Sequence, residues 1–303
     1  MSSAGGSPVR AIMYAFTANL GIAIAKLAGA LYTGSGSMLA ESIHSFADTG
    51  NQVLLFIGLK SSEKPADEDH PLGYGKLSYF WSFIVALMLF SFGGLFSIYE
   101  GVHKLTTPSE LHQVWIGLII LALAIVIEGF SLFGALHEAS LMRQKQPFWT
   151  WLRQTRNAEI VVVIGEDAAA IIGLIIAFSF LSLTWLTGDP VYDAMGSICI
   201  GVVLIVVAIF LVERLQGLLV GKSAEPAIRA LIDELIAEHD QIKCVLNTIT
   251  LQMGPKVMLA AKIELDPDLP VGEAVKLINE LEVKLKQAHP EIGWCFIEPD
   301  IVD

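Results

Sequence analysis

Six long apolar runs constrain this chain more than any other feature. They cover residues 9–31, 37–60, 77–102, 112–137, 159–183 and 191–219. A helix rises about 1.5 Å per residue, so a run of roughly 20 to 25 residues matches the ~30 Å hydrocarbon core of a bilayer. Over all 303 residues, 54% are hydrophobic and 17% are charged, and the mean hydropathy is +0.61. This balance is typical of a polytopic α-helical membrane protein, and we predict six transmembrane helices.

Lysine and arginine are distributed unequally between the two sets of connections. One set comprises the N-terminus, two loops and the stretch after the last run, and it holds Arg10, Lys60, Lys64, Lys76, Arg143, Lys145, Arg153, Arg156, Arg214 and Lys222. The opposite set holds little beyond Lys104. Because basic loops stay in the cytoplasm, both termini are predicted to be cytoplasmic. The N-terminal stretch has no small-residue cleavage site behind a short apolar core, so no signal peptide is expected.

The composition changes near Lys222, after which no apolar run is long enough to span a membrane. Helical periodicity over 225–239 and 271–288 alternates with strand patterns at 245–252, 257–265 and 293–297. The order αββαβ predicts a small α+β ferredoxin-like cytoplasmic domain. We therefore expect two domains, a transport domain over 1–220 and a dimerisation domain over 221–303.

Charge and cysteine content exclude several functions. The net charge of −12 does not favour nucleic-acid binding. Cys199, Cys244 and Cys295 are scattered without CxxC spacing, which argues against a disulfide framework. A zinc hydrolase would need a spacing such as HExxH, and the chain has none, so an enzyme is not expected. No cofactor is expected either.

The second apolar run carries two ionisable residues, His44 and Asp48, four positions apart. On a helix, this spacing directs both side chains from one face. Ionisable groups inside a membrane are costly and usually have a function, and an imidazole and a carboxylate are both zinc ligands. We interpret the pair as half of a metal site. The alternative is that the two residues only join helices by hydrogen bonds. Asn51 and Gln52 extend the same polar stretch as ligands, cavity-lining groups or helix-joining groups.

A second acidic pair, Glu166 and Asp167, interrupts the fifth run. Adjacent helical residues point about 100° apart, so both cannot face one ion without local distortion. Asp167 is therefore the preferred ligand and Glu166 the second choice, while Glu166 as a protonated or paired carboxyl remains open. The position four before Asp167 is Val163, which cannot ligate.

Other charged residues have weaker interpretations. Asp67 and His70, in the polar loop after the second run, are compatible with a second metal site, a cation entry or a solvated turn. Lys26 is expected to extend towards the membrane surface from the end of the first run. Asp193 is expected to stabilise the dipole at the start of the last run. The single carboxylates Glu41, Glu100 and Glu128 are expected to join helices and not to bind metal.

Four motifs together resemble the cation diffusion facilitator family over nearly the whole chain. They are Tyr32-Thr-Gly-Ser-Gly-Ser-Met38, Glu41-Ser-Ile-His44-Ser-Phe-Ala-Asp48, Asp67-Glu-Asp-His70-Pro-Leu-Gly73-Tyr-Gly75-Lys76 and Gly93-Gly-Leu-Phe-Ser-Ile-Tyr-Glu100-Gly. The segment around Glu166-Asp167 looks like the branch that includes the mitochondrial zinc transporter 9 and its bacterial relatives.

This resemblance implies a homodimeric exporter in a lipid bilayer that exchanges a divalent cation, Zn²⁺ first, for H⁺ by alternating access. By position, His44, Asp48 and Asp167 match the ligands of the family. Val163 replaces the His or Asp of most members, so Glu166, Asn51, Gln52 or water is expected to complete the shell. The histidines that some members carry in the tail are missing, which favours a dimerisation role for the tail. The bacterial inner membrane is the expected location.

Two alternatives remain open at this stage. The first is transport of manganese, cobalt, iron or nickel in the same fold, because a shell rich in oxygen favours harder ions. The second is a metal-sensing or structural membrane protein that transports nothing. The sequence alone does not distinguish these from a zinc transporter.

Overall fold

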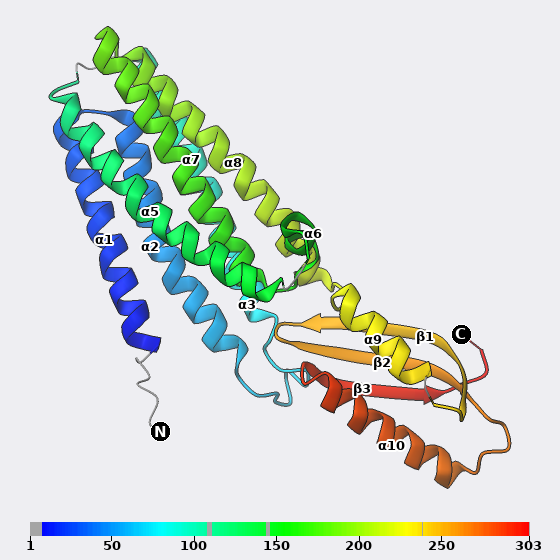
Figure 1. The fold of residues 1–303 in the computed structure, drawn as a ribbon. Helices are drawn as coiled ribbons and strands as arrows, with labels where there is room; N and C mark the ends of the chain where they lie inside the picture. Colours follow the sequence, from blue (N-terminus) through cyan, green and yellow to red (C-terminus); the bar gives the residue numbers. More distant parts are fainter. Residues whose placement is uncertain (1–7, 108–110, 144–145, 238, 303) are drawn as a thin grey trace. The chain divides into compact units, whose positions relative to one another are not determined.

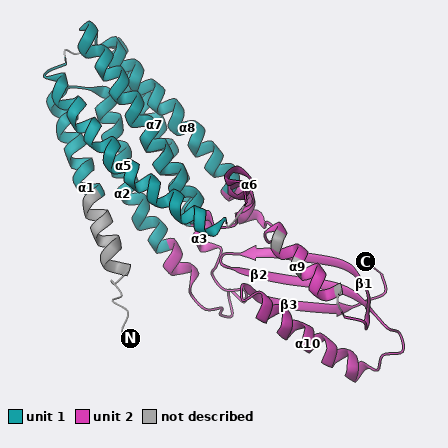
Figure 2. Ribbon diagram, in the orientation of Figure 1, with its two compact units in different colours: residues 1–57, 81–144, 159–214 teal, residues 58–80, 145–158, 215–303 magenta. Residues whose placement is uncertain are grey.

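A computed structural model of the chain describes residues 8–107, 111–143, 146–237 and 239–302, with side chains from Asn19 onward except at 227, 231 and 237. The described chain forms two compact units, coloured separately in Figure 2. The first contains residues 1–57, 81–144 and 159–214, and the second contains 58–80, 145–158 and 215–303. Each unit is considered by itself below.

The first unit is a bundle of long helices that run side by side (Figure 1). Its helices lie within α1 (Pro8–Thr33), α2 (Gly36–Ser62), α3 (Leu77–Met88), the π-helix η1 (Leu89–Leu95), α4 (Phe96–Thr106), α5 (Val114–Met142), α7 (Ala158–Thr187) and α8 (Val191–Val220). Each predicted apolar run coincides with one of these helices or, for the third run, with the continuous stretch α3–η1–α4.

Four helical segments of the described residues are long and apolar enough to cross a membrane. They are Leu77–Thr106, Val114–Met142, Ala158–Thr187 and Val191–Val220. Helices α1 and α2 have 26 and 27 residues, but they do not meet this measure within the described part of the chain. The prediction of membrane helices is therefore confirmed, and the number six stays a prediction.

The start of α2 is held by a residue from α8. Asp193 is buried and its carboxylate accepts hydrogen bonds from Ser35 Oγ (2.6 Å), Gly36 N (2.6 Å) and Ser37 Oγ (2.5 Å). Nearby, Lys104 Nζ donates to the carbonyl of Gly34, the left-handed residue that ends α1. Asp193 was expected to act on its own helix. It lies in the first turn of α8, and its carboxylate in addition caps α2, because the first N–H groups of a helix need acceptors.

The expectation that Lys26 extends to the membrane surface is wrong. The side chain is 0% exposed, and Nζ donates a 2.7 Å hydrogen bond to Ser45 Oγ and lies 3.4 Å from Glu41 Oε2. A lysine inside an apolar bundle needs partners, and α2 supplies two of them. Glu41 therefore joins α2 to α1, as expected for a single carboxylate.

The second unit contains a three-stranded sheet in the order β1 (Ile242–Met253), β2 (Lys256–Leu265), β3 (Ile292–Pro299). Strands β1 and β2 are antiparallel, and β2 and β3 are parallel. Helices α9 (Pro226–Ala237) and α10 (Val271–Ala288) complete the expected order αββαβ. The short helix α6 (Phe148–Gln154) also belongs to this unit.

The sheet has one covered and one open face. Alternate residues of β2, Leu259 and Ile263 among them, are buried with Ile232 and Ile236 of α9 and with Leu281 of α10. Period-two alternation explains why the residues between them face the other way. On that open face lies a cavity of about 160 Å³, lined by Asn247, Ile249, Ala260, Ala261, Lys262, Phe296 and Glu298. The side chains of Ile249 and Phe296 are more than half exposed.

The loop after α2 packs against the turn between β1 and β2 in the same unit. Tyr79 Oη donates a 3.0 Å hydrogen bond to the carbonyl of Gly254, and Gly75 lies so close to Met253 and Gly254 that a Cβ would overlap backbone. Glycine at 75 is therefore required by this close approach. Lys76, expected as a charge at a helix end, donates to the carbonyl of Leu219 at the end of α8.

Candidate metal site

Four helices of the first unit, α1, α2, α5 and α7, contribute to a polar cavity of about 60 Å³. Its lining includes four carboxylates, Asp48 from α2, Glu128 from α5, and Glu166 and Asp167 from α7. The other lining residues are Asn19, Ser45, Gln52, Leu55, Ser131 and Val163. Ser45, Asp48 and Gln52 share one face of α2, because they are three and four residues apart. The volume is enough for an ion or a few waters.

Both partners of the first predicted pair lie at this place, but at different depths. His44 Nε2 lies 3.4 Å from Asp48 Oδ2. The His44 side chain is 0% exposed and is not among the residues that line the cavity, whereas the Asp48 side chain is 18% exposed. Asp48 therefore lies at the wall of the cavity, and His44 lies deeper in the bundle.

Glu166 and Asp167 have different hydrogen-bond partners. Glu166 Oε1 accepts a 2.6 Å bond from Asn51 Nδ2, and Asp167 Oδ2 accepts a 2.9 Å bond from Ser131 Oγ. The two carboxylates were predicted to point about 100° apart, and their separate partners agree with this. Asn51 is buried and contacts Glu166, so it holds α2 to α7, whereas Gln52 lines the cavity.

Several buried polar atoms on α2 make no hydrogen bond to any described residue. They are Oε1 of Glu41, both ring nitrogens of His44, Oδ1 of Asp48 and Oδ1 of Asn51. Most buried polar atoms in proteins are paired, and an unpaired one costs about 1–3 kcal/mol. Imidazole nitrogen and carboxylate oxygen are also zinc ligands. Because these atoms have no hydrogen-bond partner among the described residues, their chemistry fits the coordination of a metal ion.

The donors do not form a closed ligand shell. Among the described residues, no three His, Cys, Asp or Glu side chains converge closely enough to hold a metal ion. Val163 lines the cavity four residues before Asp167 and offers no donor atom. An open set of donors suits an ion that binds and leaves, because a closed tetrahedral shell is typical of structural zinc.

Sequence reasoning missed two contributions from α5. Glu128 was assigned to helix joining, yet it lines the cavity together with Ser131. The two residues lie three positions apart in an otherwise apolar helix, so they share a face. This spacing is the feature of the sequence that could have indicated a shared polar face on α5.

Asp67 and His70 lie in the second unit, in the loop after α2. Asp67 Oδ1 accepts a 2.7 Å bond from the His70 backbone N–H, and Asp67 Oδ2 accepts a 2.6 Å bond from Tyr74 Oη. His70 Nδ1 lies 3.4 Å from Asp67 Oδ1. The bond from Tyr74 is the main cause of a pKa of Asp67 below its ordinary value of 3.8. The carboxylate is thus ionised at neutral pH, with both oxygens engaged within the loop.

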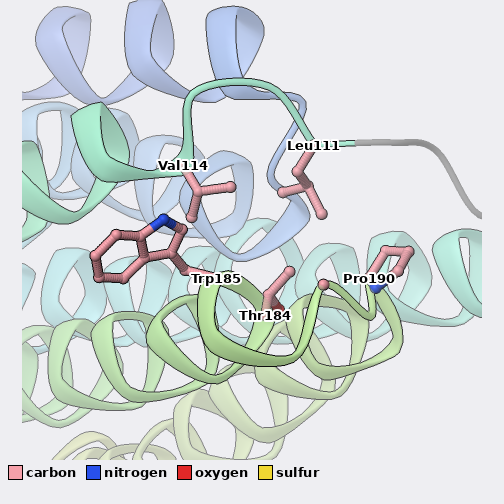
Figure 3. A pocket seen from close by; sticks show the side chains of 6 residues that line it. Leu111, Val114, Thr184, Trp185 and Pro190 are labelled. Atoms are coloured by element: carbon pink, nitrogen blue, oxygen red, sulfur yellow. The ribbon is translucent and has the colours of Figure 1, made fainter.

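A larger cavity of the first unit differs in chemistry. It measures about 370 Å³ and is lined by Leu111, Val114, Thr184, Trp185, Gly188 and Pro190 (Figure 3). Among these described lining residues there is neither a carboxylate nor an imidazole. The described lining of this cavity is therefore chemically unlike that of the polar cavity.

Comparison with known proteins identifies the family of this chain. Residues 12–219 match the cation efflux transmembrane domain, and residues 224–300 match the cytoplasmic domain of cation efflux proteins. The chain is 35% identical over 244 residues to the proton-coupled zinc antiporter SLC30A9, mitochondrial, of Xenopus laevis. That alignment covers 80% of this chain and 44% of the relative, so the chain spans less than half of that protein's length.

Two further relatives have related names. Metal tolerance protein C4 of Arabidopsis thaliana is 34% identical over 230 residues, which cover 75% of this chain and 50% of the relative. The cation-efflux pump FieF of Serratia proteamaculans is 26% identical over 269 residues, which cover 88% of this chain and 83% of the relative. The names antiporter and cation-efflux pump describe transporters and not enzymes. The chain belongs to the cation efflux family, also called the cation diffusion facilitator family.

Proposed function

We propose that this chain carries divalent metal cations, zinc first, across a lipid bilayer in exchange for protons. The observation that carries the proposal is the cavity in which carboxylates of α2, α5 and α7 meet. Four carboxylates, with no cationic residue among the described lining residues, favour a cation over an anion. The imidazole of His44 beside Asp48 favours zinc among these cations.

In this proposal His44, Asp48 and Asp167 are the principal ligands. Glu166, Gln52 or Asn51 completes the shell at different stages, because Val163 offers no donor. To bind the metal, Glu166 must lose its hydrogen bond from Asn51. Asp167 must likewise lose its hydrogen bond from Ser131. Each ligand must lose its proton to bind metal, so protons and metal compete for one set of groups. Rocking of one group of helices against the other would expose the site alternately to each side.

The remaining architecture is proposed on the same basis. Residues 1–220 form the transport domain with six membrane helices and cytoplasmic termini, and residues 221–303 form a ferredoxin-like cytoplasmic domain. Helix α2 has the length of a membrane helix, and its low apolarity reflects the polar residues that the site requires. Of the basic residues counted for orientation, Lys145 lies outside the described residues. The bacterial inner membrane stays the predicted location.

We assign the second unit a role in homodimerisation. The matched family domain is a dimer-forming cytoplasmic domain, and the open face of the sheet exposes Ile249 and Phe296. An exposed apolar sheet face of this kind is typical of an interaction surface. Asp67 and His70 are proposed as a second, weaker cation site that competes with bonds inside the loop.

Manganese, cobalt, iron or nickel is the second candidate cargo. The specific observation in its favour is the dominance of oxygen donors, since His44 is the one nitrogen ligand proposed from the described residues. A non-transporting metal-binding protein would have no use for an open, incomplete shell. It therefore has less support than either form of transport.

Transport into proteoliposomes tests the proposal. Purified protein is reconstituted, and uptake of Zn²⁺, Mn²⁺, Co²⁺, Fe²⁺ and Ni²⁺ is measured with and without a pH gradient. We expect zinc uptake that rises with the gradient and that falls to the level of empty vesicles for Asp48→Asn and Asp167→Asn. Asp240→Asn, the same change at an exposed position of the tail, is the matched control. The absence of metal-dependent flux, or full flux in both Asp48→Asn and Asp167→Asn, would overturn the proposal.

A further inference from the structure

Lys26 is a buried cation to which the transport scheme assigns no task. It lies on α1 with 0% exposure, inside a helix bundle where charged groups are expensive and usually functional. Its ammonium group donates to Ser45 Oγ at 2.7 Å and lies 3.4 Å from Glu41 Oε2. A neutral side chain would join α1 and α2 at lower cost, so the charge itself needs an explanation.

The partners of Lys26 place this charge directly behind the wall of the polar cavity. Ser45 is a lining residue and precedes Asp48 by three positions on the same face of α2. One hydrogen bond therefore separates the ammonium group from the surface that faces the transported ion. Where the structure describes the lining, it includes four carboxylates and no lysine or arginine.

Glu41 balances this charge from the other side. Its Oε2 faces Lys26, while Oε1 makes no hydrogen bond to any described residue and occupies the space that a Cβ at Gly173 of α7 would need. The carboxylate thus lies three residues before His44, against α7, and it is not among the residues that line the cavity. Lys26 and Glu41 form an oriented pair with the positive end towards the lining residue Ser45.

We propose that the Lys26–Glu41 pair sets the affinity of the cavity for the transported divalent cation. This inference rests on the proposed transport function. The positive end at Ser45 repels a divalent ion and offsets part of the attraction of the four carboxylates, which keeps binding weak enough for release. Lys26 is a positioning residue in this scheme, since it acts through Ser45 and through its field without touching the ion.

Charge-neutralising variants separate this role from simple helix joining. Removal of the cation in Lys26→Met should tighten zinc binding about tenfold, and removal of the anion in Glu41→Gln should weaken it about tenfold. The double variant should return to within about threefold of the wild-type dissociation constant. Opposite shifts of the zinc dissociation constant in the two single variants, which cancel in the double variant, indicate an electrostatic effect of the pair on the ion. Loss of a structural link would weaken binding in both single variants.

The experiment measures zinc dissociation constants of the full-length protein in detergent by competition with a fluorescent chelator. Thermal unfolding of each variant is recorded alongside. Lys60→Met, the same change at an exposed position of α2, is the control and should leave the constant unchanged. Zinc release after dilution should slow in Lys26→Met and accelerate in Glu41→Gln.

Each result of these zinc-binding measurements supports or overturns the role of the Lys26–Glu41 pair. Equal or same-direction shifts in the two single variants overturn the role of the pair and leave transport intact, whereas a wild-type protein that binds no divalent ion overturns both proposals. Lys26→Met leaves Glu41 buried without its partner, so this variant has the greatest risk of misfolding. If it does not fold, Glu41→Gln decides alone, because its amide oxygen still accepts a bond from Lys26. An unchanged or tighter constant there contradicts the inference.

Discussion

Two buried polar clusters share helix α2, and they differ in how completely their atoms are paired. At the start of the helix, the carboxylate of Asp193 accepts bonds from Ser35, Gly36 and Ser37, all between 2.5 and 2.6 Å. In the middle of the helix, both nitrogens of His44 and one oxygen of Asp48 make no hydrogen bond to any described residue. Both clusters are buried in the same unit and carry similar groups.

The contrast supports the proposal that the first cluster stabilises the fold and the second binds the metal. A capped helix start satisfies backbone N–H groups and contributes to folding. Unpaired buried atoms cost free energy, so their presence among the described residues supports the metal as their proposed partner. A substitution in the first cluster should therefore change stability, and one in the second should change metal binding.

Matched Asp→Asn substitutions test this distinction with the largest expected effect. Asp193→Asn should lower the free energy of unfolding by about 3 kcal/mol, because an amide cannot accept all the bonds that the carboxylate accepts. Asp48→Asn should leave stability unchanged or higher, since it removes a buried charge with an unpaired oxygen. Chemical unfolding in detergent, followed by fluorescence, measures both.

Zinc binding by the same two variants should show the reverse of the pattern expected for their stability. Folded Asp193→Asn protein should retain the wild-type dissociation constant, whereas Asp48→Asn should lose measurable binding. If Asp48→Asn destabilises the protein as strongly as Asp193→Asn, the unpaired atoms of the middle cluster belong to the fold and not to a ligand.

Val163→His should increase zinc affinity by roughly tenfold, equal to about 1.4 kcal/mol. The new imidazole would lie four residues before Asp167 in the lining of the cavity and would supply the missing donor. A tighter site should also release metal more slowly, so turnover should fall. Calorimetry and proteoliposome flux measure the two effects, with Val163→Leu as the control. An unchanged zinc affinity would show that the ion binds elsewhere.

The smallest expected effect concerns the loop of Asp67. Tyr74→Phe removes the hydrogen bond that chiefly depresses the pKa of Asp67, so this pKa should rise towards its ordinary value. A depressed carboxyl pKa stabilises the folded state above the unfolded-state pKa, and this contribution disappears as the pH falls through the folded-state pKa. The variant and the wild type should therefore differ slightly at neutral pH and converge in acid.

Carboxyl-carbon NMR of aspartate-labelled protein measures that titration. Addition of zinc to the same samples tests the loop as a second site, since the variant frees one oxygen of Asp67 for a metal. A zinc-dependent shift that is stronger in Tyr74→Phe would support competition between the metal and the internal bond. An Asp67 pKa that does not change would show that the Tyr74 bond is not formed in solution.

Local patterns predicted the elements of this protein well. The apolar runs coincide with helices, and the predicted helix at 271–288 is α10 (Val271–Ala288). Strand 245–252 was predicted too short, because β1 (Ile242–Met253) continues through residues whose alternation is broken by register shifts. Helix and strand periodicities are properties of neighbouring residues, so they can be read directly from the sequence.

Partners across helices were harder to predict. The burial of Lys26 depends on Ser45 and Glu41, and the cap by Asp193 depends on a helix more than 150 residues earlier in the chain. A single lysine or aspartate in an apolar run has the same local pattern whether it reaches the surface or a buried partner. Only the packing of the bundle distinguishes these cases.

By itself, the sequence determined the helices, the order αββαβ of the tail and the shared face of His44 and Asp48, because spacing along a helix or strand sets direction. The tertiary structure decided that Glu128 and Ser131 of α5 join Asp48 and Asp167 around one cavity. It also decided that Glu166 bonds to Asn51. These contacts depend on how helices pack, and many distant residues contribute to that packing at once.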